Sequence, residues 1–163
     1  MESGQTPQTR GFLFSDLRGY SAFTERHGDA AARELLTRYR RIVRDVIGSF
    51  GGAEIRTEGD SFYVVFDSVS RAVRAGLAIL DASRTAASDA SLAAIAVGIG
   101  IHAGESEDSV EGIVSGAVNV AARICAQAKP GELLVRQRRT TCRALRRLRC
   151  RMLLRIDYRR LTG

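Results

Sequence analysis

Two aspartates that are distant in the sequence each follow a short strand-like segment. Asp16 closes the apolar run 11–15, and Asp60 lies in a glycine-containing turn between strand-like runs 53–56 and 62–66. Paired carboxylates bind hard cations, and Mg²⁺ prefers one or two carboxylates together with phosphate oxygens. If the two side chains meet, the expected ligand is a nucleoside triphosphate with two metal ions, about 3.5 to 4 Å apart, that activate an attacking oxygen and stabilise a leaving one. Alternatively, Asp16 is a helix cap and Asp60 a turn residue, because aspartate favours both places.

The elements that must position these aspartates follow from the spacing of apolar residues and glycines. Three- and four-residue spacing predicts amphipathic helices from about Asp29 to Phe50 and from Val69 to Leu80. Small residues predict a further helix at 117–128. The predicted strands are residues 11–15, 53–56, 62–66, 95–101 and 133–135, and the predicted loops are residues 83–91 and 105–111.

This order of elements predicts an α+β fold. It is that of a ferredoxin-like βαββαβ sandwich with an extra helix and strand. Crossovers between parallel strands are almost always right-handed, so the first two strands are expected to run in the same direction and end at one edge of the sheet. Asp16 and Asp60 are therefore expected to meet there. Gly98 and Gly100 share one face of strand 95–101, where we expect another element to pack closely.

The basic residues are concentrated at the C-terminus. The chain of 163 residues has a net charge of +7, but residues 136–163 contain eleven arginines and one acid, so the rest is slightly acidic. We therefore predict an N-terminal extension at 1–10, one domain at 11–135 without a nucleic-acid surface, and an Arg-rich tail at 136–163. Leu145, Leu148 and Met152 have helical spacing, which would suit a basic amphipathic helix on a membrane or nucleic acid. The alternative is a C-terminus replaced by a change of reading frame.

Cysteine usage and hydropathy indicate a cytoplasmic chain. The three cysteines are odd in number and have no paired metal spacing, which is typical of a reduced compartment. The longest apolar run, 92–101, is too short to span a bilayer. Cys125 is expected in the core rather than as a nucleophile, and His102 is expected to be structural.

Four segments, in order along the chain, resemble the catalytic domain of class III adenylate/guanylate cyclases. Residues 14–21 and 56–62 resemble the two metal-binding segments of that family. Residues 97–105 are similar to its glycine-rich strand, and residues 117–124 to its catalytic helix. The resemblance covers residues 11 to about 135 and implies an atypical C-terminal tail, because no closing hairpin with a lysine is apparent after Val135.

The resemblance implies a role for each metal-site residue. Asp16 and Asp60 would bind two ions of Mg²⁺ or Mn²⁺ per site, with the carbonyl group of Leu17 completing one of the two ion sites. The backbone amides of Tyr20 and Ser21 would hold the terminal phosphates, as successive amides in a turn can. The implied reaction converts a purine nucleoside triphosphate to a 3′,5′-cyclic nucleotide and pyrophosphate.

The resemblance also implies a shared active site. Asn119 and Arg123 are four residues apart and project from one helix face, which in the family approaches the ribose and the α-phosphate. Arg123 would stabilise charge that develops on phosphorus. In the family these residues face the metal aspartates of a second chain, and this chain has both halves. A homodimer with two composite sites is therefore implied.

Base recognition departs from the family pattern. Arg56 and Gly112 stand where the family reads the base, and glycine has no side chain for this purpose. ATP is the expected substrate and GTP the alternative. Two other functions stay open: a catalytically degenerate homologue that acts as a nucleotide-binding or regulatory partner, and a nucleic-acid-binding module that uses the basic tail.

Overall fold

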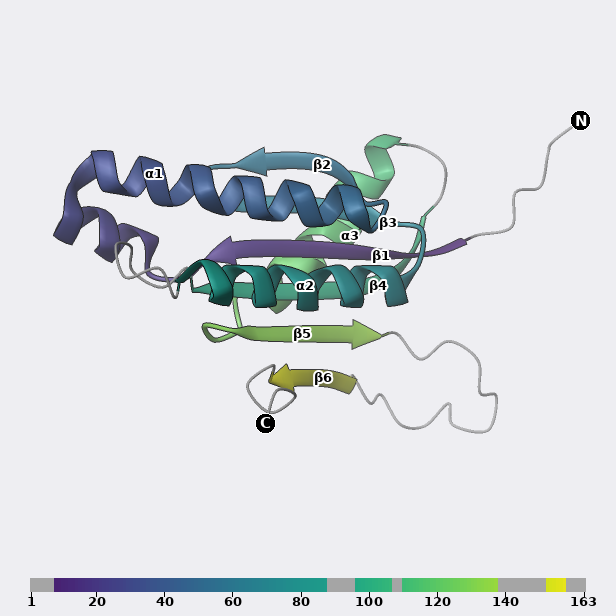
Figure 1. Ribbon diagram of the computed structural model, residues 1–163. Coiled ribbons are helices and arrows are strands. Elements are labelled where there is room, and N and C mark those ends of the chain that lie inside the picture. The colour runs from purple at the N-terminus through teal and green to yellow at the C-terminus, as the bar shows by residue number, and fades with distance from the viewer. Residues whose placement is uncertain (1–7, 88–95, 107–109, 138–151, 158–163) are drawn as a thin grey trace, which may run out of the picture.

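The computed structural model describes residues 8–87, 96–106, 110–137 and 152–157, which form one mixed sheet with helices on both faces (Figure 1). The strand order in the sheet is β2-β3-β1-β4-β5-β6. This confirms the predicted α+β class. The elements are β1 (Gln8–Leu17), α1 (Tyr20–Ser49), β2 (Ala53–Glu58), β3 (Ser61–Phe66), α2 (Val69–Ala87), β4 (Val97–Ser106), α3 (Val110–Cys125), β5 (Glu132–Gln137) and β6 (Met152–Asp157).

The direction of the first two strands follows the crossover rule. β3 lies between β1 and β2 and is antiparallel to both, so β1 and β2 run in the same direction. β1 is the central long strand and also pairs with β4, which places Asp16 opposite Gly98. The end of β1 and the β2–β3 turn therefore lie at one edge of the sheet, as predicted.

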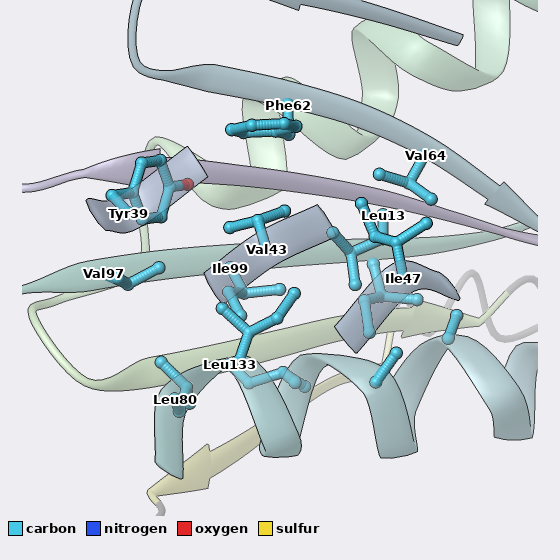
Figure 2. Close-up of a cluster of buried hydrophobic side chains, with 14 of the residues drawn as sticks. Leu13, Tyr39, Val43, Ile47, Phe62, Val64, Leu80, Val97, Ile99 and Leu133 are labelled. Carbon is cyan, nitrogen blue, oxygen red and sulfur yellow. The ribbon is translucent and has the colours of Figure 1, made fainter. Parts of the chain in front are cut away.

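The two faces of the sheet bury different side chains. Leu13 and Leu17 of β1 pack in the cluster under α1 and α2, whereas Phe12 and Phe14 pack against α3 on the other face. Figure 2 shows the first cluster, in which the buried side of α1 contacts β1, β3 and β4. The α1 residues of this cluster recur every four positions, as in an amphipathic helix: Leu35, Tyr39, Val43 and Ile47.

The glycines of β4 allow close packing on the α3 face, as predicted. A Cβ atom at Gly100 would overlap the amide nitrogen of Cys125 and the carbonyl oxygen of Ala121, so the backbone of α3 rests directly on this strand. A Cβ atom at Gly98 would overlap the guanidinium group of Arg18. Both contacts need a residue without a side chain.

Several predicted boundaries are wrong. α1 begins at Tyr20 rather than near Asp29, and Gly28 interrupts it with a φ of 82°. α2 continues to Ala87, so the first part of the predicted loop 83–91 is helical. β4 continues to Ser106 because β1 pairs with it along its whole length. The predicted loop 105–111 is therefore wrong at both ends, and its residues 107–109 lie outside the described residues. The predicted start of the last helix is also wrong, since α3 begins at Val110.

Part of the C-terminal tail belongs to the sheet. Residues 152–157 form β6, which pairs antiparallel with β5 along Glu132–Gln137. The predicted helix is therefore wrong at Met152, which begins a strand. The edge of β5 has unpaired backbone groups, and β6 forms hydrogen bonds with them. Within the described residues, the single strand β6 follows β5. Leu145 and Leu148 lie outside the described residues.

Candidate functional site

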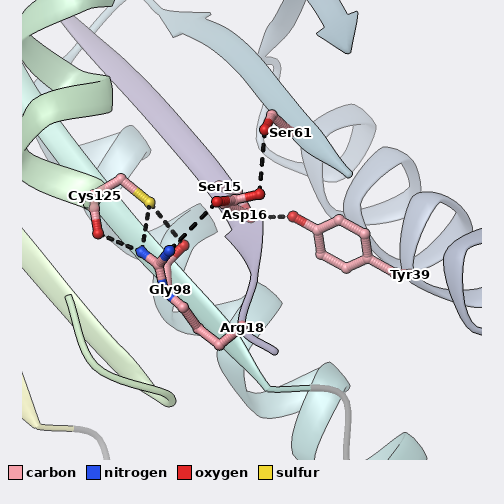
Figure 3. Close-up of polar contacts among 7 residues, drawn as sticks. All are labelled: Ser15, Asp16, Arg18, Tyr39, Ser61, Gly98 and Cys125. Carbon is pink, nitrogen blue, oxygen red and sulfur yellow. Dashed lines mark hydrogen bonds and ion pairs between the residues drawn. The ribbon is translucent and has the colours of Figure 1, made fainter. Parts of the chain in front are cut away.

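Asp16 and Asp60 lie close together at the edge of the sheet. The hydroxyl group of Ser61, the residue after Asp60, donates a hydrogen bond of 3.1 Å to Oδ1 of Asp16 (Figure 3). Partial burial, followed by the nearby negative charge of Asp16, raises the pKa of Asp60 to about 6. Two carboxylates held this close favour a cation between them or a proton on one of them.

The turn that carries Asp60 is fixed from two sides. Gly59 adopts a left-handed φ of 58°, which lets β2 reverse into β3. Arg40 of α1 donates a hydrogen bond of 2.6 Å to the carbonyl oxygen of Gly59. Ser61 anchors the other side of the turn through Asp16. The position of Asp60 thus depends on both α1 and β1.

The raised pKa of Asp60 predicts a pH effect on the metal-free protein. Its folded-state pKa of about 6 exceeds the ordinary 3.8, so its contribution to stability is complete below about pH 4 and is lost as pH rises through 6. The Asp60→Asn protein lacks this loss. We expect the Tm of Asp60→Asn to exceed that of the parent at pH 7 without metal, and the difference to shrink at pH 5. A difference that stays constant in thermal scans contradicts this.

A buried hydroxyl pair supports β1 immediately before Asp16. Ser15 and Tyr39 of α1 are both fully buried, and their side-chain oxygens lie 2.6 Å apart. Burial raises the pKa of Tyr39 well above its ordinary value, so the phenol stays protonated. This bond connects the strand of the candidate site to the core side of α1.

Removing one member of this pair is expected to cost stability. Tyr39→Phe leaves the buried Ser15 hydroxyl without its partner, which we expect to lower the free energy of unfolding by about 1 to 3 kcal/mol in urea titrations. The double variant with Ser15→Ala removes both polar groups and should cost less than the sum of the single changes. Strict additivity would show that the two hydroxyls do not interact.

Arg18 joins the candidate site to the end of α3. Its Nη1 atom lies 3.3 Å from Oδ2 of Asp16, and its Nη2 atom donates to the carbonyl oxygen of Cys125 and lies 3.2 Å from the Cys125 Sγ atom (Figure 3). The guanidinium crosses over Gly98, whose carbonyl oxygen accepts from the Cys125 thiol at 3.2 Å. Burial is the main cause that raises the pKa of Cys125 to about 12, so this thiol is a neutral core group, as predicted.

The first turn of α1 directly follows the end of β1, which carries Asp16. Gly19 has a left-handed φ of 74°, and Tyr20 and Ser21 open the helix after it. Amides in the first turn of a helix have no partner within the helix and are directed toward an anion. A cavity of about 190 Å³ borders this turn and is also lined by Leu17 and Arg26. The predicted phosphate-binding amides thus belong to a helix start that follows Asp16 closely along the chain.

Asn119 and Arg123 lie on a different surface. Both are exposed, whereas Ala121 and Cys125 of the same helix are buried against the sheet. Residues two positions apart point about 200° apart around a helix, so Arg123 is directed away from the sheet that carries Asp16. One protomer therefore does not bring these two side chains to its own aspartates.

The two positions predicted for base recognition lie on β2 and α3. Arg56 is exposed on β2, where its Nη2 atom lies 2.5 Å from Oε1 of Glu58 and its guanidinium stacks over the Tyr63 ring at 5.5 Å. Gly112 lies in the first turn of α3.

The donor set suits a hard divalent cation that keeps open positions. Within the described ranges, no group of three or more His, Cys, Asp or Glu side chains could enclose a metal ion. A closed structural zinc site needs four such ligands, whereas Mg²⁺ and Mn²⁺ accept two carboxylates with water and phosphate oxygens. Asp16 and Asp60 therefore fit ions that complete their coordination with a phosphate ligand.

Comparison with known proteins decides the family. The family model described as the adenylate and guanylate cyclase catalytic domain matches residues 3–159. The chain belongs to this family. An uncharacterized protein of Mycobacterium tuberculosis is 32% identical to this cyclase domain over 130 residues, which cover 77% of this chain and 32% of the relative. The cyclase domain thus spans about a third of the length of that curated relative.

Solved cyclase structures share the fold of this cyclase domain. The guanylyl cyclase Cya2 has a TM-score of 0.68 and 26% identity, with coverage of 82% of this chain and 77% of that chain. The adenylyl cyclase CyaB from P. aeruginosa has a TM-score of 0.66 and 20% identity, with coverage of 80% and 78%. Among the described residues of the cyclase domain, no helix is long and apolar enough to cross a membrane.

Two polar residues of the site were not found from the sequence. The partner of Arg18, Cys125, is 107 positions away, and the lack of a side chain at Gly98 is the only sequence signal that another group crosses the strand there. Arg40 is one of several arginines in α1, and nothing in its spacing distinguishes it as the residue that holds the Asp60 turn. Neither contact has a local sequence pattern.

Proposed function

We propose that this domain is a nucleotidyl cyclase that converts a purine nucleoside triphosphate to a 3′,5′-cyclic nucleotide and pyrophosphate. The observation that carries the proposal is the meeting of Asp16 and Asp60 beside the first turn of α1. Family membership supports the reaction class. ATP is the expected substrate, and the similar structures include both an adenylyl and a guanylyl cyclase, so GTP must be tested as well.

The active form is proposed to be a homodimer with two composite sites. Asn119 and Arg123 face away from the aspartates of their own protomer, so an exposed α3 face has to meet the aspartates of a second copy. Each site then contains Asp16 and Asp60 from one chain and Asn119 and Arg123 from the other. Neither chain alone holds a complete site.

In the proposed mechanism, Asp16, Asp60 and the Leu17 carbonyl would hold two ions of Mg²⁺ or Mn²⁺. When bound, these ions supply charge neutralisation and lower the pKa of the attacking hydroxyl group. The amides of Tyr20 and Ser21 bind the terminal phosphates, which become the leaving pyrophosphate. These contacts hold the leaving group in place while the ribose end stays free to react.

The other chain acts on the reacting end of the substrate. Asn119 orients the ribose so that the 3′-oxygen lies in line with the α-phosphorus and the leaving oxygen. The 3′-oxygen forms a bond to phosphorus, the bond to pyrophosphate breaks, and the hydroxyl proton passes to solvent. Arg123 stabilises the negative charge on the phosphoryl oxygens with its planar set of donors.

The test is an assay of the purified chain with Mn²⁺ and either ATP or GTP, in which cyclic nucleotide and pyrophosphate are both measured. The matched control is Asp60→Ala, which keeps the α3 surface. Equal amounts of the two products from the parent alone support the proposal and identify the base. A folded dimer that binds nucleotide and forms no product overturns it in favour of the degenerate homologue.

A degenerate homologue has one observation in its favour. Arg56, expected to read the base, is engaged by Glu58 on its own strand. In the assay this alternative predicts that nucleotide raises the Tm while no pyrophosphate appears. The cyclase proposal predicts both effects.

A further inference from the structure

We propose that Arg18 is a positioning residue that connects the metal-binding end of β1 to the helix carrying Asn119 and Arg123. In the homodimer proposed above, on which this inference rests, α3 serves the site of the partner chain. Arg18 would then link the two composite sites, because one guanidinium contacts Asp16 of one site and the helix of the other.

Arg18 contacts both the end of β1 and the end of α3. Its side chain is 20% exposed and that of Asp16 is 25% exposed, so water screens their ion pair only in part. Its Nη2 atom binds the carbonyl oxygen of Cys125, the last residue of α3. A cation at the C-terminus of a helix is favoured by the helix dipole and by the carbonyl groups that have no partner within the helix.

β4 fixes the path of the Arg18 side chain. Gly98 lies opposite Asp16 in the β1–β4 pair, and the guanidinium occupies the space that a Cβ atom would fill. At the base of the side chain, the Arg18 amide donates to the carbonyl oxygen of Ala96 at 2.7 Å, which fixes the backbone. The guanidinium is therefore held in place and does not sample the solvent freely.

The chemistry of the guanidinium suits a link. Its Nη1 and Nη2 atoms contact two different elements at once, which the single ammonium group of lysine does not reproduce. When a divalent ion neutralises Asp16, the pull of that carboxylate on Nη1 weakens. The hydrogen bond to Cys125 then dominates and restrains the end of α3.

The first test follows α3 without turnover. Hydrogen–deuterium exchange is measured on the full chain with and without Mn²⁺ and without nucleotide. In the parent, Mn²⁺ should slow exchange at the β2–β3 turn and, by at least about twofold, at amides 122–128. In Arg18→Met and Arg18→Lys the turn should still respond, whereas amides 122–128 should not.

The outcomes separate this inference from the proposed function. If Mn²⁺ protects the turn but never α3 in the parent, the link is overturned and the metal site stands. If Mn²⁺ protects neither region, the metal site of the proposed function fails and the link fails with it. If Arg18→Met and Arg18→Lys retain the response of α3, Arg18 is not the connecting residue.

The second test places the Arg18→Lys substitution in one chain of a heterodimer at a time. An Asp60→Ala chain and an Arg123→Ala chain are mixed in equal amounts, so that the heterodimer contains one complete site. Arg18→Lys is then added to either chain. Because Arg18 is proposed to act on both Asp16 and α3, we expect kcat to fall by at least about fivefold in each placement, with little change in KM.

A defect in only one placement would overturn the link and reduce Arg18 to a local contact of Asp16 or of α3. No defect in either placement would also overturn it. Gly98→Ala displaces the guanidinium and keeps its charge, so it should also lower kcat in each of the two placements. Each variant is compared at equal dimer content and at a temperature below its Tm, so that loss of folding does not imitate the result.

Discussion

An equal mixture of the Asp60→Ala and Arg123→Ala chains is expected to regain cyclase activity that neither chain has alone. Asp60→Ala removes one of the two carboxylates that hold the ions, and Arg123→Ala removes the donors that stabilise the transition state. Loss of one such donor typically lowers kcat by about 10²- to 10³-fold. The two lesions lie on separate surfaces of the protomer, so one heterodimer site escapes both.

The size of the recovery follows from counting sites. With random pairing, half of the dimers are heterodimers and each has one intact site of two, so the mixture should reach about a quarter of the parent activity. The Tm of the Arg123→Ala chain should stay within about 1 °C of the parent, because the side chain is exposed. Activity in the mixture no higher than in either chain alone would exclude a shared site between protomers.

The placement of the two aspartates was predictable because it depends on topology. β1 and β2 are joined by a helical crossover and run parallel, and the carboxyl ends of parallel strands in one sheet lie at the same edge whatever the details of packing. The close packing at Gly100 was predictable for a related reason. Alternating glycines in an apolar strand leave room that a compact domain fills with another element.

The polar contacts that hold the site were not predictable. Arg18 and Cys125 are far apart in sequence, and whether an arginine crosses a strand depends on the position of α3 to within a few ångströms. Tyr39 looked like any apolar position of an amphipathic helix, but its hydroxyl group binds Ser15 beside Asp16. Pattern analysis assigns a residue to a face and does not identify the atom that it meets there.

Several predicted boundaries of helices and strands were wrong for a similar physical reason. The polar residues of the α1 segment before Gly28 gave no clear amphipathic pattern, but this segment is helical. β6 lies in an arginine-rich region that resembled a helix, and its pairing with β5 sets its conformation. Tertiary contacts overrode local preference in both places.

Gly100→Ala is expected to lower the free energy of unfolding more than Gly98→Ala, whose added Cβ atom would meet only a side chain. The added methyl group would overlap backbone atoms of Cys125 and Ala121, which cannot rotate away as a side chain can. Overpacking of this kind typically costs about 1 to 3 kcal/mol, and α3 would have to shift along the sheet to relieve it. Urea unfolding monitored by circular dichroism measures the loss.

The matched control for this change is Gly48→Ala. Gly48 is exposed near the end of α1 and has no atom within 4 Å of the Cβ position, so alanine should be neutral or stabilise the helix by up to about 1 kcal/mol. Because α3 carries Asn119 and Arg123, Gly100→Ala should also lower kcat at temperatures where the domain stays folded. A Gly100→Ala protein as stable and active as Gly48→Ala would show that the backbone of α3 does not rest on β4, and with it the path of Arg18 to Cys125 would lose its support.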